Sequence, residues 1–354
     1  MKKPARLKDI AASCGVSCAT VSDVLNGKSL QKGIKAETQE KILKTAKLLR
    51  YQANSNARSI VTGKSNLIAA LLPSVSNSFY GPIYDSFQSF LNDQGYSVML
   101  FLSGLNQTLE NKFIDKILAL QAEGCLAVPC SSQKGKSSVG ELKAYGVPTI
   151  FFDVVPPVQG ADFFCFDNYQ GAYAATKYLL ELGRRNIVLF IRELEVKPYN
   201  KLDVDRMNGF SDACKNFDVL CGPDNFYMVG RKSCDTNDYF SLGYHCTAEL
   251  LETKPETNAI ICTNDEFALG AYKAAEKRNL KIPRDISIIG YGNRRFAEYM
   301  APPLTTLHQN LKELGEILGQ YLFEKIKSGK AESQGIKRAI PTPLIERESC
   351  AKWF

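Results

Sequence analysis

The chain has 354 residues, of which 45% are hydrophobic and 23% charged, enough for a large core and for two or three domains. No apolar run reaches the length of a transmembrane helix, and the polar, basic segment 1–9 is not followed by the apolar stretch of a signal peptide. We therefore expect a cytoplasmic protein with no membrane partner.

The cysteines and histidines argue against a metal site and against catalysis. Eleven cysteines are scattered without a Cys-x-x-Cys pair, and the only histidines are His245 and His308. A zinc site needs clustered ligands, and a disulfide framework needs an oxidising compartment. There is also no Walker or Rossmann glycine fingerprint. The sequence predicts reduced cysteines, no metal, no cofactor and no enzymatic activity.

The positive charge lies at one end of the chain. Residues 1–64 contain 13 Lys or Arg and 4 Asp or Glu, a net charge of +9, whereas the whole chain carries +7. The remaining residues therefore carry −2. Lysine and arginine displace counterions from phosphates, so a basic segment favours nucleic-acid binding, although a basic surface can also be merely solvated.

The basic segment has the pattern of three short helices. The first is expected over Leu7–Ser13 and the second over Cys18–Leu25, with Gly15 in the turn and Ser17 as the N-cap. A third, over Ala36–Arg50, closes a three-helix core. Two short helices at a glycine turn, braced by a third, form a helix-turn-helix unit whose second helix enters the major groove of DNA.

The second helix has two faces. Val21, Val24 and Leu25 form an apolar stripe that can pack on the first helix. The opposite stripe can face outward, and it consists of Cys18, Ala19, Ser22 and Asp23.

From residue 67 onward, short apolar runs alternate with stretches of helical length, which indicates parallel sheets covered by helices. The expected strands are Leu67–Leu72, Ser97–Leu102, Cys125–Val128, Pro148–Phe152, Ile187–Ile191, Ala259–Cys262 and Ile286–Ile289. The expected helices are Tyr80–Asp93, Asn111–Ala122, Tyr169–Leu182, Val204–Phe217 and Asp265–Arg278. Sheets of this kind bind ligands at the carboxyl ends of their strands.

An ordered set of short motifs resembles the lac-repressor (LacI/GalR) family of transcriptional regulators over nearly the whole chain. In the head the motifs are Leu7–Ala11, Gly15–Ser17, Ala19–Ser22 and Val24–Gly27, followed by Tyr51, Asn54 and Ala57–Ile60. Further on they are Ser76–Tyr80, Phe152–Asp153, Asp167–Tyr169, Leu182–Arg185, Arg206, Gly209–Phe210, Asn264–Glu266, Ala268–Gly270, Pro283–Gly290 and Pro302–Thr306.

The resemblance implies an α/β protein with an N-terminal all-α helix-turn-helix head and a periplasmic-binding-protein-like ligand domain of two parallel-sheet subdomains. The expected divisions are a head over 1–54, a hinge over 55–64 and an effector-binding and dimerisation domain over 65–354. The chain is expected to cross between the subdomains near 163–166 and 290–295. A periplasmic binding protein would share the ligand domain, but it would carry a signal peptide and lack the basic head.

The implied function is effector-controlled, sequence-specific DNA binding by a homodimer on a palindromic operator, usually with repression as the outcome. The effector is expected to be sugar-like, and its binding could lower or raise the affinity for DNA. The residues carried over to DNA contact are Ser17, Cys18, Ala19, Thr20, Ser22, Asp23 and Asn26.

The head departs from the family pattern at two places. Many relatives carry Arg or His where this chain has Asp23, and a carboxylate accepts from cytosine N4 or adenine N6 but repels phosphate. The operator is therefore expected to be atypical. The loop Lys28–Lys35 is about three residues longer than in relatives. Lys35 replaces a capping serine at a helix start, where a cation is unfavourable.

The segment Ser55–Val61 resembles the family hinge. There a short helix orders on DNA and inserts an apolar wedge into the minor groove. The residues implied are Ala57, Arg58 and Ile60, with Ile60 as the wedge in place of the usual leucine. A plain linker is the alternative.

For the effector site the resemblance implies Phe79, Asp153, Arg206 and Asn264. An aromatic ring can stack on a ligand ring, and the polar groups can bind its hydroxyls. Taken singly, Asp153 could be a cap and Phe79 could belong to the core. Relatives often place Asp directly after Gly-Phe or Gly-Tyr, but here Gly290-Tyr291 is followed by Gly292 and then Asn293. The missing acceptor argues against a simple hexose and makes Asn293 a further candidate, with Arg294 beside it, whereas His308 is interpreted as structural.

Overall fold

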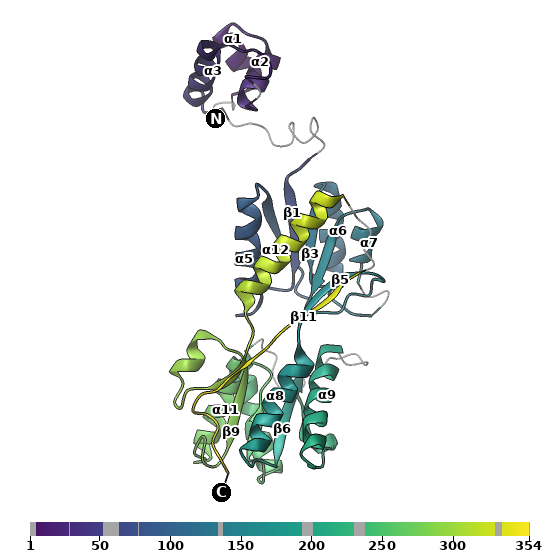
Figure 1. Ribbon diagram of the computed structural model, residues 1–354, viewed down its shortest axis with the longest axis vertical. Helices are drawn as coiled ribbons and strands as arrows, with labels where there is room; N and C mark the ends of the chain where they lie inside the picture. Colours follow the sequence, from purple (N-terminus) through teal and green to yellow (C-terminus); the bar gives the residue numbers. More distant parts are fainter. Residues whose placement is uncertain are drawn as a thin grey trace. The chain divides into compact units, whose positions relative to one another are not determined.

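The computed structural model (Figure 1) describes residues 5–27, 29–51, 64–76, 78–133, 137–192, 201–229, 238–329 and 335–353. The chain divides into two compact units, Met1–Ser65 and Asn66–Phe354. Each unit has its own hydrophobic core. Among the described helices, none combines the length and the apolar character that crossing a bilayer requires.

The first unit is a three-helix head, as predicted. Its helices are α1 (Leu7–Cys14), α2 (Cys18–Leu25) and α3 (Ala36–Leu48). Ile10, Val21 and Ile42, one from each helix, are completely buried and meet in one core. Val21 and Val24 are both buried, so the 3.6-residue spacing of apolar side chains predicted the inward face of α2 correctly.

The second unit begins with an N-terminal lobe built on a six-stranded, all-parallel sheet in the order β11-β5-β4-β3-β1-β2. The strands are β1 (Leu67–Leu72), β2 (Ser97–Leu102), β3 (Gly124–Ala127), β4 (Thr149–Phe152), β5 (Asp162–Phe166) and β11 (Lys337–Ile340). Helices α5 (Tyr80–Asp93) and α12 (Leu311–Ser328) pack side by side against one face of the sheet. Helices α6 (Gln107–Ala119) and α7 (Gly140–Ala144) cover the other face.

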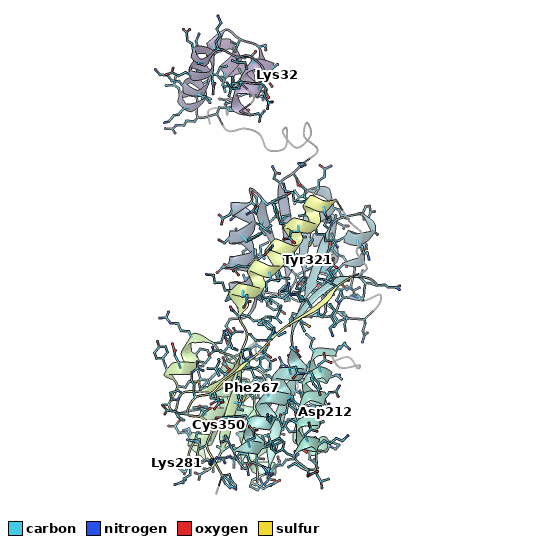
Figure 2. All side chains as sticks on the ribbon, in the orientation of Figure 1. Lys32, Asp212, Phe267, Lys281, Tyr321 and Cys350 are labelled. Carbon is cyan, nitrogen blue, oxygen red and sulfur yellow. The ribbon has the colours of Figure 1, made fainter. Side chains whose placement is uncertain are left out.

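The C-terminal lobe repeats this plan with the sheet order β12-β10-β9-β8-β6-β7, in which only β12 is antiparallel. The strands are β6 (Ile187–Arg192), β7 (Phe226–Val229), β8 (Ala259–Ile261), β9 (Ser287–Gly292), β10 (Thr305–His308) and β12 (Leu344–Ile345). Helices α8 (Asn168–Glu181) and α9 (Lys201–Asn216) cover one face, and α10 (Tyr239–Thr253) and α11 (Asp265–Lys277) cover the other. Phe267 and Cys350, labelled in Figure 2, both lie in the interior of this lobe.

The chain passes between the lobes three times: after β5, between β10 and α12, and between β11 and β12. The first passage follows Phe166, in agreement with the expectation near 163–166. The expected crossing near 290–295 is wrong, because β9 is followed by a 3-10 helix (Arg295–Tyr299) and then by β10, which pairs with β9 in the same sheet. The chain leaves the C-terminal lobe only beyond His308.

Glycines bring α10 and α11 into backbone contact. A Cβ atom added at Gly243 would lie 2.1 Å from the carbonyl oxygen of Phe267, and one at Gly270 would lie 2.1 Å from that of Phe240. Any side chain at either position would force the two helices apart. The amino-terminal ends of both helices line a cavity between the two lobes, so this close packing also shapes that cavity.

Candidate functional site

The turn before α2 sets where that helix starts. Gly15 adopts the left-handed conformation with φ of 73°, which costs glycine little because it has no Cβ. Ser17 is the N-cap, and its hydroxyl accepts a hydrogen bond from the backbone N–H of Thr20 at 3.1 Å. The hydroxyls of Ser17 and Thr20 also lie 2.9 Å apart in a second hydrogen bond. These contacts position the first turn of α2.

The seven head residues predicted to contact DNA all lie at the surface of the head. Cys18, Ala19 and Asn26 are exposed, and Ser22 and Asp23 are partly exposed on the face opposite the buried Val21 and Val24. The amide of Asn26 donates to the hydroxyl of Ser22 at 3.2 Å, which orients both side chains. The surface of α2 therefore offers small groups, hydroxyls and one carboxylate.

Helix α3 braces the turn through contacts that the sequence did not reveal. The Lys41 ammonium donates to the Cys14 carbonyl at 3.1 Å, and the Cys14 thiol contacts the Thr45 hydroxyl at 3.3 Å. Lys35 precedes α3, and its side chain makes no capping hydrogen bond. The predicted hinge residues Ala57, Arg58 and Ile60 lie outside the described residues.

The second unit contains a cavity of about 150 Å³ that is lined from both lobes. Its lining residues from the N-terminal lobe are Ser78, Phe79, Tyr80, Phe152, Asp153, Cys165, Phe166, Gln309 and Leu314. Those from the C-terminal lobe are Asn168, Leu202, Asp203, Arg206, Val229, Tyr239, Leu242, Thr263, Asn264, Glu266 and Arg294. The wall is thus partly aromatic and partly charged, which suits a small polar ligand with a ring.

Four of the five residues predicted for the effector site, Phe79, Asp153, Arg206 and Asn264, line this cavity. Asn293 is not among the lining residues, because its side chain is engaged elsewhere. Its amide nitrogen lies 3.1 Å from Nδ1 of His308, and its oxygen accepts from Arg347 at 2.7 Å. The structure therefore gives Asn293 and His308 structural contacts.

Aromatic residues at the start of α5 and the ends of strands form the N-terminal wall. The ring of Phe79 packs edge-on against those of Tyr80 and Phe166, with centroids 5.0 and 6.2 Å apart. Asp153 directly follows β4, and its carboxylate accepts from the hydroxyl of Tyr80 at 2.5 Å. This hydrogen bond holds the carboxylate at the cavity wall.

Arg206, on α9, is held in place by two neighbours. Its Nε donates to the amide oxygen of Asn168 at 2.7 Å, and its guanidinium lies over the ring of Tyr291, 4.2 Å from the centroid. The Tyr291 hydroxyl donates to the same oxygen at 3.2 Å, and burial raises its pKa, which keeps the hydroxyl protonated as a donor. This leaves the terminal nitrogens of Arg206 at the cavity.

Asn264 and Glu266 mark the start of α11. The amide oxygen of Asn264 accepts from the backbone N–H of Phe267 at 2.7 Å, so Asn264 is the N-cap. Glu266 accepts a hydrogen bond from Ser78 of the N-terminal lobe, and this contact links the two lobes beside the cavity. Asn264 thus positions the helix, and Glu266 joins the two walls.

Sequence reasoning did not identify the buried carboxylate of Asp265. Its two oxygens accept from the Thr306 hydroxyl and from the backbone N–H of Arg294, each at 2.6 Å. Burial raises the pKa of Asp265, and these two hydrogen bonds act against that rise. The contacts hold the loop after β9 so that Arg294 reaches the cavity. The sequence did mark this loop as unusual, because Gly292 stands where the family resemblance led us to expect an acidic residue.

A helix-turn-helix head joined in one chain to two parallel-sheet lobes around a cavity is the architecture of a ligand-controlled DNA-binding regulator. Residues 6–54 match the family model "Bacterial regulatory proteins, lacI family", and residues 176–350 match "Periplasmic binding protein-like domain". Repressors named PurR are similar over almost the full length. That of Vibrio atlanticus is 30% identical over 345 residues, 98% of each chain, and that of Histophilus somni is 30% identical over 344 residues, 97% of this chain and 98% of its own.

Solved structures show the same fold. The lac repressor dimer bound to operator and the anti-inducer ONPF superposes with a TM-score of 0.83 at 23% identity, covering 99% of this chain and 100% of its own. A ribose-bound LacI family regulator from Enterococcus faecium has a TM-score of 0.67 at 26% identity, covering 80% of this chain and 98% of its own. The chain belongs to the LacI family of bacterial transcription regulators.

Proposed function

We propose that this regulator is a repressor that binds a palindromic operator as a homodimer and is controlled by a small sugar-like effector in the cavity between its lobes. The observation that carries the proposal is the meeting of Phe79, Asp153 and Arg206 at one cavity, although they lie far apart in the sequence. An aromatic ring can stack on a sugar ring, while a carboxylate and a guanidinium bind its hydroxyls.

The size of the cavity supports a small effector. Its volume of about 150 Å³ is below the range of roughly 300–1,000 Å³ that is common for drug-sized ligands, so one ring fills it. The related regulator from Enterococcus faecium is solved with ribose, a ligand of this size class.

The two activities are coupled through the cavity, because a ligand that touches both lobes changes how they sit relative to each other. Residues 55–61 connect the head to the lobes, and we place Ala57, Arg58 and Ile60 in the minor groove when the dimer is on DNA. Coupling of this kind is reciprocal and amounts to about 1–3 kcal/mol, or roughly a 5- to 150-fold change in operator affinity. An inducer lowers the affinity, and a corepressor raises it.

The test is selection of DNA from a random pool by the purified full-length protein, followed by titration of the selected site with sugars. We expect a palindromic motif whose half-sites repeat at the spacing of helical turns. At least one sugar or sugar derivative should change the affinity for that motif. Selection of no motif, with or without these compounds, would overturn the proposal.

Asp23 provides a sharper test of the recognition surface. Asp23→Arg should change the preferred base at one position of each half-site, because a carboxylate selects cytosine or adenine and a guanidinium selects guanine. The expected discrimination is about 1–3 kcal/mol, or roughly 5- to 150-fold between bases. Repeating the selection with the variant measures it.

Glu40→Arg is the matched control, since Glu40 is exposed on α3 and the change in charge is the same. This control should raise general affinity for DNA without altering the motif. If Asp23→Arg and Glu40→Arg select the same motif, Asp23 does not face the bases.

A further inference from the structure

We propose that the cavity is built for an effector that carries a negatively charged group, a phosphate or a carboxylate, and that Arg294 is the residue that binds it together with Arg206. This inference rests on the proposed function, and it specifies the chemical class of the effector. Two observations carry it: the incomplete hydrogen bonding of Arg294 and the glycine beneath its guanidinium.

The hydrogen bonds of Arg294 are incomplete. Its backbone N–H is held by Asp265, and its Nη1 donates to the carbonyl of Gly292 at 3.4 Å. Its Nε is buried and has no hydrogen-bond partner in the part of the chain that the structure describes. Within that same part, Arg294 forms no ion pair with a carboxylate. A buried donor without an acceptor is costly, so the guanidinium is incompletely satisfied by the protein. Arg294 also lines the cavity, where an anionic ligand can accept from its terminal nitrogens.

Gly292 leaves the space that the guanidinium occupies. A Cβ atom at position 292 would lie 3.2 Å from both Cζ and Nε of Arg294, and φ of 135° there disfavours residues with side chains. The guanidinium therefore lies where a side chain at 292 would begin. The resemblance placed an acidic residue at this position, so this chain presents a cationic donor where relatives often present an acceptor.

The carboxylates of the cavity already accept hydrogen bonds from the protein. Asp153 accepts from Tyr80, and Glu266 accepts from Ser78. A third carboxylate, that of Asp203, is buried at the cavity wall. Each of these carboxylates keeps lone pairs that can accept from a ligand hydroxyl, whereas the cationic donors that line the cavity are the guanidinium groups of Arg206 and Arg294.

The environment of Arg294 strengthens its interaction with a bound anion. Burial lowers the pKa of Arg294, since desolvation penalises its charged form, although an arginine remains protonated. Phe79 faces it from the other lobe, with the ring centroid 6.0 Å from Cζ. An anion bound here can accept a bidentate pair of hydrogen bonds from the guanidinium in a partly desolvated site. A ring carrying that anion can also contact Phe79.

The first experiment uses inorganic phosphate as the probe and the full-length protein. Thermal unfolding and calorimetric titration are run at constant ionic strength, with chloride as the reference anion. Phosphate should stabilise and bind the wild type. Arg294→Gln should weaken phosphate binding by about tenfold or more. Arg294→Lys keeps the positive charge but loses the bidentate hydrogen bonds, so it should weaken binding less.

Arg295→Gln is the matched control, because Arg295 is the neighbouring residue and is exposed. This variant should bind phosphate as the wild type does. Equal loss in both glutamine variants, or no binding of phosphate to the wild type, would overturn the assignment of Arg294.

The second experiment compares ribose, ribose 5-phosphate and ribonate, which separates a neutral sugar from its phosphate and its acid. We expect one or both anionic forms to bind at least about tenfold more tightly than ribose, with the preference lost in Arg294→Gln. Binding of ribose that matches its anions and is unaffected by Arg294→Gln would overturn the inference while leaving the proposed function standing. No binding by any of the three, together with an operator affinity that no compound changes, would overturn both.

Discussion

Arg206→Met should weaken binding of the effector by roughly 30- to 1,000-fold, corresponding to about 2–4 kcal/mol. The guanidinium of Arg206 is already oriented by Asn168 and stacked over Tyr291, so it binds a ligand without first losing side-chain freedom. Methionine keeps much of the volume and apolar stem but removes every donor. Calorimetric titration with ribose and ribose 5-phosphate measures the change.

The affinity of this variant for the operator should also no longer change when these ligands are added, because coupling requires the ligand to bind. Lys215→Met, which removes an exposed cation from the same helix, is the matched control and should bind the ligands as the wild type does. Circular dichroism checks that both variants are folded. If the two variants bind the ligands equally well, Arg206 does not contact the effector.

Gly270→Val should destabilise the second unit by about 4 kcal/mol or more, above the usual cost of roughly 1–3 kcal/mol for overpacking. A Cβ atom there would lie 2.1 Å from the Phe240 carbonyl oxygen and 2.6 Å from the backbone nitrogen of Tyr244. Backbone atoms cannot rotate away as a side chain can, so α10 and α11 must separate. Thermal unfolding of the full-length protein should show a melting temperature lower by about 10 °C for this unit.

The same substitution should also impair the cavity, since Tyr239 and Leu242 on α10, and Glu266 on α11, line it. Gly222→Val is the control: it lies in the same lobe, and an added Cβ would meet no atom of the described residues within 4 Å. Its melting temperature should stay close to that of the wild type. If Gly270→Val had the same melting temperature as this control, the contact between the two helices would not be tight in solution.

The local elements were predictable because their causes are local. The sequence predicted α2 over Cys18–Leu25 and α5 over Tyr80–Asp93 with the bounds that the structure shows. For α2 the reason lies within a few residues, in a glycine that can adopt positive φ and a serine that caps the next helix. Short buried strands are harder to predict, and β5 (Asp162–Phe166) was missed because a brief apolar run carries no periodicity of its own.

Where the chain crosses between the lobes could not be predicted from local sequence patterns. Strand β10 belongs to the C-terminal sheet because it pairs with β9, and strand β11 belongs to the N-terminal sheet because it pairs with β5. Such pairing joins residues that are distant in the sequence. The expected crossing near 290–295 therefore came too early, although the alternation of strands and helices was interpreted correctly.

The sequence by itself determined a basic three-helix head and an alternation of strands and helices, and its resemblance to the LacI family predicted two lobes with an aromatic ring, a carboxylate and a guanidinium at the effector site. Only the tertiary structure decided which of the adjacent residues Asn293 and Arg294 reaches that cavity. Asn293 is held by His308 and Arg347, while Asp265 binds the backbone of Arg294 and Gly292 leaves room for its guanidinium. The direction of a side chain in a loop depends on such distant partners, and no local pattern encodes them.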